Sequence, residues 1–148
     1  MSSQMSEKDL AEVKAIIANS TLRSVDYYEV SARRNDGATQ SGDSDQGRLT
    51  VEVQQRVDDT SFGIRLQATV VLPVGEATAS VAGEYDLLNG VAPRRRALQL
   101  FANEVAVMTV LPYLREAIAT ITAKVFGQPV HLPIAERGEI ALDVDDDE

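Results

Sequence analysis

The segment at about residues 97–125 constrains the fold most, because its pattern is helical and it is apolar on nearly every side. At its centre, in residues 104–115, Thr109 is the one plainly polar residue between the charged ends. A helix on the surface of a domain shows one apolar stripe, whereas a helix that is apolar all round is normally buried all round. A chain of 148 residues has too little protein to surround such a helix. We therefore expect copies of the chain to bury it together, as in an oligomeric binding protein.

Pro112 lies inside this helical pattern. A proline there deletes one backbone hydrogen bond and crowds the carbonyl of Met108, so we expect a kink, with a break into two helices as the alternative. Gly127 is expected to end the helix. The proline-containing residues 128–134 must then be extended.

Segments rich in alternating apolar and polar residues precede the helix and predict β-strands. They span about residues 22–33, 49–57, 62–72 and 79–87. The last three are joined by short turns and predict an antiparallel meander with one apolar face. The polar loop before them is too long for a simple hairpin and suits a crossover connection.

The length is most simply that of one domain, with a different segment at each end. Ser6 precedes acidic residues and a helical apolar pattern, which predicts a capped amphipathic helix ending near Asn19, within residues 1–20. Residues 21–142 form the main domain. Residues 143–148 are mostly acidic, and we expect them to be a disordered tail.

The charge balance argues against nucleic acid as a partner. There are 23 acidic and 14 basic residues, a formal net charge of −9, and such a surface repels phosphate even with three arginines at 94–96. The absence of cysteine excludes disulfides and thiolate sites, and it is compatible with a cytoplasmic protein. Neither a signal peptide nor an apolar run of roughly 20 residues is evident, so we expect no membrane insertion.

Few residues are suited to catalysis. His131 is the only histidine and lies between two apolar residues, where packing or a hydrogen bond is its expected role. No residues have metal-ligand spacing, and no glycine-rich loop could cradle a phosphate. We therefore expect no enzyme activity, no cofactor and no metal. The surplus apolar surface predicts an oligomer interface, a groove for apolar ligands, or both.

Several motifs occur in the order found in the SecB family of export chaperones, which the chain resembles over about residues 22–134. They are Glu29-Val30-Ser31 closing the first strand, Gly75-Glu76-Ala77-Thr78-Ala79 opening the fourth, Leu111-Pro112-Tyr113-Leu114-Arg115-Glu116 within the helix, and Gly127, Pro129, Leu132, Pro133 and Ile134 after it. The helix motif is the most specific of these.

The resemblance implies an α+β fold in which a four-stranded antiparallel sheet packs on the long C-terminal helix. It also implies a homo-oligomer, with sheets joined edge to edge in dimers and helices packed between dimers in a tetramer. The implied activity is ATP-independent holding of unfolded polypeptides, either preproteins for export or an antitoxin in toxin–antitoxin control. An export motor ATPase is the other implied partner, and the implied location is the cytoplasm.

The resemblance also implies a client groove and a partner contact. The groove residues are Tyr28, Val30, Phe101, Leu111, Leu114, Phe126, Leu132 and Ile134, each of which could instead be ordinary core. The expected partner contacts are Glu29 and Glu84. Gly83 and Arg33, however, stand where the family has acids, and the family's second helix is shortened or absent after Leu142. These departures suit the SecB-like chaperones that guard an antitoxin.

Two other functions fit the same pattern of elements. One is a helix-grip domain, in which a curved sheet wraps a C-terminal helix around a small ligand, although that fold usually has more strands. The other is an adaptor subunit that forms an oligomer and binds no client.

Overall fold

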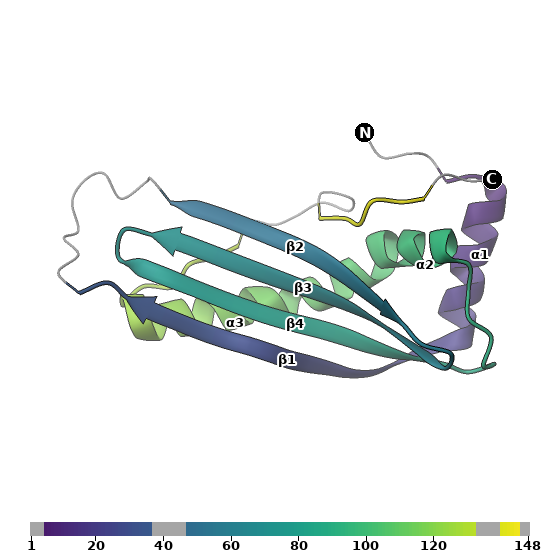
Figure 1. Cartoon of the computed structure of the whole chain (residues 1–148), viewed down its shortest axis with the longest axis horizontal. Coiled ribbons are helices and arrows are strands. Elements are labelled where there is room, and N and C mark those ends of the chain that lie inside the picture. The colour runs from purple at the N-terminus through teal and green to yellow at the C-terminus, as the bar shows by residue number, and fades with distance from the viewer. Residues whose placement is uncertain (1–4, 37–46, 133–139, 146–148) are drawn as a thin grey trace.

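The computed structural model describes residues 5–36, 47–132 and 140–145. One antiparallel sheet forms a layer, and a long helix lies along one of its faces (Figure 1). The strands are β1 (Ser20–Arg34), β2 (Arg48–Val57), β3 (Ser61–Leu72) and β4 (Gly75–Leu87). Their order across the sheet is β1-β4-β3-β2. The predicted meander of β2, β3 and β4 and the crossover between β1 and β2 are both confirmed.

The alternation of side chains along β3 separates the two faces of the sheet. Phe62, Ile64, Leu66 and Ala68 are fully buried against the helix, and Arg65 is on the opposite face and half-buried. Burying apolar area stabilises a fold by roughly 25 cal/mol per Å². This face therefore sets the register of the meander, because a slip by one residue would turn every apolar side chain outward.

The long helix has three consecutive parts: α2 (Arg95–Phe101), a π-helical turn η1 (Ala102–Ala106) and α3 (Val107–Phe126). Pro112 lies inside α3, so the alternative of a break at this proline is wrong. The irregular turn comes earlier, at η1. Pro112 and Met108 are both exposed, so water can bond the Met108 carbonyl that the proline leaves without a donor. Gly127 ends α3 with a left-handed φ of 84°.

The helix is not buried all round within one chain. By length and composition the stretch Arg95–Phe126 could cross a membrane, in contrast to the sequence-based expectation. However, 67% of its most apolar window is buried inside the fold, as in the core helix of a domain. The face turned away from the sheet still exposes Met108 and Tyr113.

An aromatic cluster joins the sheet to the helix. The rings of Phe62 and Tyr85 stack with centroids 4.8 Å apart, and Phe101 packs edge-on against both. Gly83 on β4 allows the close approach of the helix, because a Cβ at this position would lie 2.9 Å from Cγ2 of Val110. The acid that the family resemblance expects at Gly83 would therefore point into this packed layer.

Two segments outside the sheet pack against α2. Helix α1 (Glu7–Asn19) begins with a reciprocal capping box, in which Ser6 Oγ accepts from the Asp9 amide and Asp9 accepts from the Ser6 amide. Near the other end of the chain, residues 140–145 run beside α2 (Figure 1). Residues 143–145 thus differ from the predicted disordered tail, because main-chain hydrogen bonds and apolar packing hold them, whereas residues 146–148 lie outside the described residues.

Candidate polypeptide-binding site

The structure divides the predicted groove residues between the core and the surface. Five of them are at most 5% exposed and belong to the core: Phe101, Leu111, Leu114, Phe126 and Leu132. Tyr28 and Val30 are exposed on β1, and Ile134 lies outside the described residues. Within a single chain these residues do not form one continuous surface. The five buried ones belong to the core, which was the alternative to a groove.

Tyr28 belongs to a polar cluster on the face of the sheet that points away from the helix. The β1–β4 register shifts between Tyr27 and Glu29, which leaves Tyr28 at a bulge. The guanidinium of Arg65 lies 4.4 Å from the centroid of the Tyr28 ring, and the hydroxyl donates to Glu84 Oε2 at 3.4 Å. Tyr28 is thus held by polar partners rather than by an apolar groove.

Glu84 is the centre of this cluster. Its side chain is 6% exposed, and Oε1 accepts a 2.6 Å hydrogen bond from a guanidinium nitrogen of Arg56. This bond raises the pKa of Arg56 above its ordinary value, because the carboxylate stabilises the charged form. Glu29 is different: its carboxylate is exposed and accepts a hydrogen bond from Ser31. Of the two predicted partner contacts, Glu29 therefore offers a solvent-facing charge and Glu84 does not.

A hollow lies between edge strand β2, helix α2 and the segment 140–145, and we call it the β2–α2 groove. It has a volume of about 690 Å³. Its lining consists of Val53, Gln55, Val57, Pro93, Arg95, Leu98, Gln99, Ala141, Leu142 and Asp143. The lining mixes apolar side chains with polar ones, which are Gln55, Arg95, Gln99 and Asp143, so the groove offers both apolar contacts and hydrogen-bonding groups.

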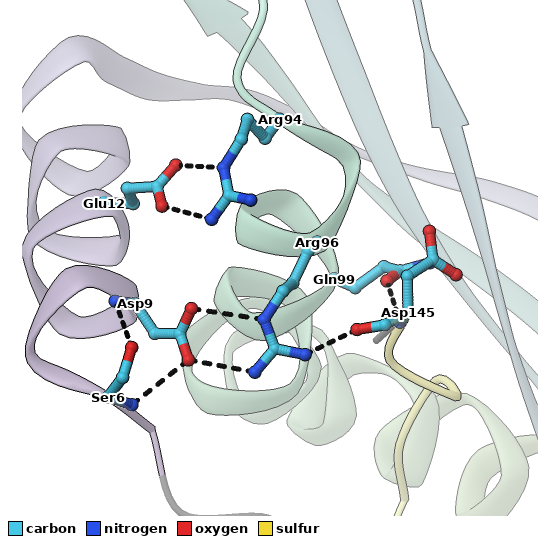
Figure 2. A network of polar contacts seen from close by, with 7 residues as sticks. All are labelled: Ser6, Asp9, Glu12, Arg94, Arg96, Gln99 and Asp145. Carbon is cyan, nitrogen blue, oxygen red and sulfur yellow. Dashed lines mark hydrogen bonds and ion pairs between the residues drawn. The ribbon is translucent and has the colours of Figure 1, made fainter. Parts of the chain in front are cut away.

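One wall of the β2–α2 groove is the segment 140–145, which side chains of the long helix hold by its main chain. The Asn103 amide makes two hydrogen bonds to Leu142, donating to its carbonyl at 3.0 Å and accepting from its N–H at 2.7 Å. One helical turn earlier, Gln99 Oε1 accepts from the N–H of Asp145 at 2.8 Å, and Arg96 donates to the Asp145 carbonyl (Figure 2). Side-chain amides can satisfy any main chain, so this recognition does not depend on sequence.

Sequence reasoning missed Gln55, Gln99 and Asn103 as functional candidates. A signal was present, because Gln55 breaks the alternation of β2, and Gln99 and Asn103 are polar residues one turn apart on an otherwise apolar helix. Their partner, the segment 140–145, could not be inferred from local patterns.

A second exposed apolar area covers strand β1 and the outer side of α3, and we call it the β1–α3 surface. It includes Leu22, Tyr27, Val30, Met108 and Tyr113, each at least 36% exposed. Tyr27 lies close to α3: burial raises the pKa of its hydroxyl, and Glu116 and Tyr113 raise it further. An edge strand with exposed apolar groups is a site where another chain can pair.

The described part of the chain contains no group of three His, Cys, Asp or Glu residues placed to hold a metal ion. His131 is exposed and is outside both surfaces.

The comparisons with known proteins agree with this architecture. No family model matches the chain. The SecB-like chaperone SmegB of Mycolicibacterium smegmatis is 30% identical over 132 residues, which cover 88% of this chain and 86% of the relative. In fold, the chain is similar to the SecB-like chaperone Rv1957 of Mycobacterium tuberculosis, solved in complex with a ChAD peptide from the antitoxin HigA1. That match has a TM-score of 0.73 and 18% identity, and it covers 86% of this chain and 98% of the other. The sheet topology, the long helix and the extent of the SmegB match together show that the chain belongs to the SecB-like chaperone family.

Proposed function

We propose that the chain is an ATP-independent holdase, a chaperone that binds unfolded polypeptide segments and has no enzyme activity. The observation that carries this proposal is the wall of the β2–α2 groove formed by residues 140–145, whose main chain bonds to Gln99 and Asn103 and whose alternate side chains pack on the core. Many weak apolar contacts combined with main-chain hydrogen bonds give affinity without sequence specificity.

An antitoxin is the client class that we favour, and a preprotein for export is the second. The structural relative Rv1957 was solved with an antitoxin peptide, which supports the first class. An acidic contact for an export motor would be incomplete here. Glu84 is paired with Arg56, and Gly83 lies under Val110, so Glu29 remains as the exposed acid. We place this activity in the cytoplasm, where clients of both classes are made.

The β1–α3 surface supports a homo-oligomer, and we propose a tetramer built as a dimer of dimers. Pairing of β1 edges would complete the ladder of one dimer, and Met108 and Tyr113 would pack between dimers. The helix-grip alternative is less well supported, because Ile64, Leu66 and Val81 belong to the packed core between sheet and helix and have no exposure.

The holdase proposal predicts suppression of aggregation. We expect the chain to keep a reduced, unfolded model protein soluble at an equimolar ratio and to do so partly at substoichiometric ratios, measured by light scattering without nucleotide. Val57→Asp, a change at an exposed groove residue, should weaken binding by about tenfold, because it removes apolar contact and places a charge there.

Val91→Asp is the matched control, since Val91 is 65% exposed and does not line the groove. Equal loss in both variants would argue against the groove. Absence of suppression by the unaltered chain at either ratio would contradict the holdase and would leave the client-free adaptor.

A further inference from the structure

The segment 140–145 is held in the manner expected of a bound client. Ile140, Leu142 and Val144 pack against the core, and the residues between them are exposed, which is the alternation of an extended chain. In the described part of the chain, the hydrogen bonds that hold this segment go to its main chain. One ion pair, between Arg95 and the Asp145 carboxylate at 3.1 Å, is largely exposed and adds little.

The opposite wall of the groove has an unused hydrogen-bond acceptor. Gln55 comes from β2, faces the same side of the sheet as Val53 and Val57, and lines the groove beside Ala141 and Leu142. Its Oε1 atom is buried and has no hydrogen-bond partner among the described residues. A buried carbonyl without a donor is unfavourable, and an N–H group of a polypeptide entering the groove would satisfy it.

We propose that residues 140–145 are a resident pseudo-client, and that an extended polypeptide with alternating apolar residues displaces them from Asn103 and Gln99. The incoming chain also donates a main-chain N–H to Gln55. This inference rests on the proposed holdase function and adds a self-occupied, competitive state to it. The occupant is identified by chemistry, because one wall of the groove is already an extended peptide of this kind, held by its main chain.

Competition from the same chain is effective even when the segment binds weakly. A tethered segment acts at an effective concentration on the order of 1 mM. The apparent Kd for a client rises by the inverse of the fraction of molecules whose groove is open. If the groove is open in about one molecule in ten, releasing the segment tightens client binding by about tenfold.

The first test compares two variants that add the same charge inside and outside the segment. Leu142→Asp places a carboxylate on a half-buried side chain and should release the segment, whereas Val91→Asp changes a residue that is 65% exposed and does not line the groove. The probe is fluorescein-labelled, reduced and carboxymethylated α-lactalbumin, and the measurement is fluorescence anisotropy. We expect about tenfold tighter binding for Leu142→Asp and unchanged binding for Val91→Asp.

A second test uses Gln55→Met, which keeps the length of the side chain and removes the orphan acceptor. The thermal midpoint should rise or stay the same, because a buried unpaired atom is gone, while client affinity should fall by about fivefold. Opposite signs for stability and affinity are not expected of a purely structural residue. Unchanged client affinity in this variant would overturn the role of Gln55.

Displacement can also be observed directly, with a dye on the segment itself. The chain has no cysteine, so Ala141→Cys gives one labelling site for an environment-sensitive dye. The dye signal should change with the same Kd as client binding. If the dye still reports a docked segment when the client is saturating, the client does not displace the segment and the proposal is overturned. Equal client affinity of Leu142→Asp and the unaltered chain would also overturn the proposal, while the holdase function would stand. If neither the unaltered chain nor any variant binds the client, the proposed holdase function is contradicted as well.

Discussion

Gly63 determines where the Glu84 carboxylate can lie. A Cβ at position 63 would approach the two carboxylate oxygens to 2.7 and 2.9 Å, so the carboxylate lies in space that only glycine leaves free. From there it reaches Arg56. Glu84 was predicted as a partner contact, but its carboxylate bonds within the chain and joins β4 to β2.

Glu84→Gln and Glu29→Gln provide a matched pair, since each removes one negative charge from the sheet. We expect Glu84→Gln to lower the free energy of unfolding by about 1–2 kcal/mol, because a charge-assisted hydrogen bond is weakened at a buried position. Glu29→Gln should change it by less than about 0.5 kcal/mol, since Glu29 is exposed. Urea unfolding followed by circular dichroism measures both values, and equal effects would contradict the assignment.

At the scale of elements, ion pairs between α1 and the beginning of α2 dock the N-terminal helix (Figure 2). Arg96 donates two hydrogen bonds to the Asp9 carboxylate, which is 1% exposed, and Arg94 pairs with Glu12. Arginines at a helix start oppose the helix dipole, and these acids compensate for that. Arg94 and Arg96 therefore form a docking site for α1.

The docking of α1 should depend on pH. Hydrogen bonds from Arg96 lower the pKa of Asp9 well below its ordinary value of 3.8, despite burial, which acts in the opposite direction. Because the folded pKa is depressed, the pair contributes its full stability above the ordinary value and loses it as the pH falls toward the folded pKa. The pKa of Glu12 is lowered mainly by Arg94, and its contribution has the same sign.

Asp9→Asn tests this docking. We expect a loss of about 2 kcal/mol at pH 7, because a charged hydrogen-bonded pair is broken, and a flatter dependence of stability on pH between 5 and 3. Urea unfolding across this range measures both effects, and limited proteolysis at pH 7 shows whether α1 is released. Glu7→Gln, in the same first turn, is the control. A parallel pH profile for Asp9→Asn and the unaltered chain would show that the pair does not stabilise the fold.

Local patterns identified these elements, whereas contacts between distant residues did not follow from them. The alternation of β3 and the Ser6 cap each depend on about a dozen neighbouring residues or fewer, so the strand faces and the start of α1 could be predicted. The Asn103–Leu142 bonds join residues 39 apart, and the Arg96–Asp9 pair joins residues 87 apart. No periodicity encodes such pairs, which is why the β2–α2 groove and its occupant were missed.

At the scale of the whole molecule, the long helix is covered by its own chain on only part of its surface, and its burial by copies of the chain stays a prediction. The sheet covers one side of it, and residues 130–132 and 140–145 cover another. Thr122 accepts from the Val130 amide, and Arg115 donates to the Leu132 carbonyl, so the chain folds back along α3. The large apolar side chains of the helix that remain exposed are Met108 and Tyr113, and both belong to the β1–α3 surface.

This surface predicts the state of assembly. We expect analytical ultracentrifugation to show a particle several times the 16.0 kDa chain, and Tyr113→Glu to reduce it to a smaller species, because a charge there cannot be buried between helices. Leu88→Glu is the control, since Leu88 is 64% exposed in the turn that follows β4. Sedimentation of the unaltered chain as a monomer at high concentration would rule out the oligomer.

The order of strands has a consequence for how the protein is made. β1 is the first of the strands to leave the ribosome, yet its partner in the sheet is β4, which begins 41 residues after β1 ends. The hairpins of β2, β3 and β4 can form at once, since their pairings are local. Throughout that interval β1 has no partner, and Leu22, Tyr27 and Val30 are open to other nascent chains. During its own translation, a member of a chaperone family thus passes through the vulnerable state from which we propose it protects others.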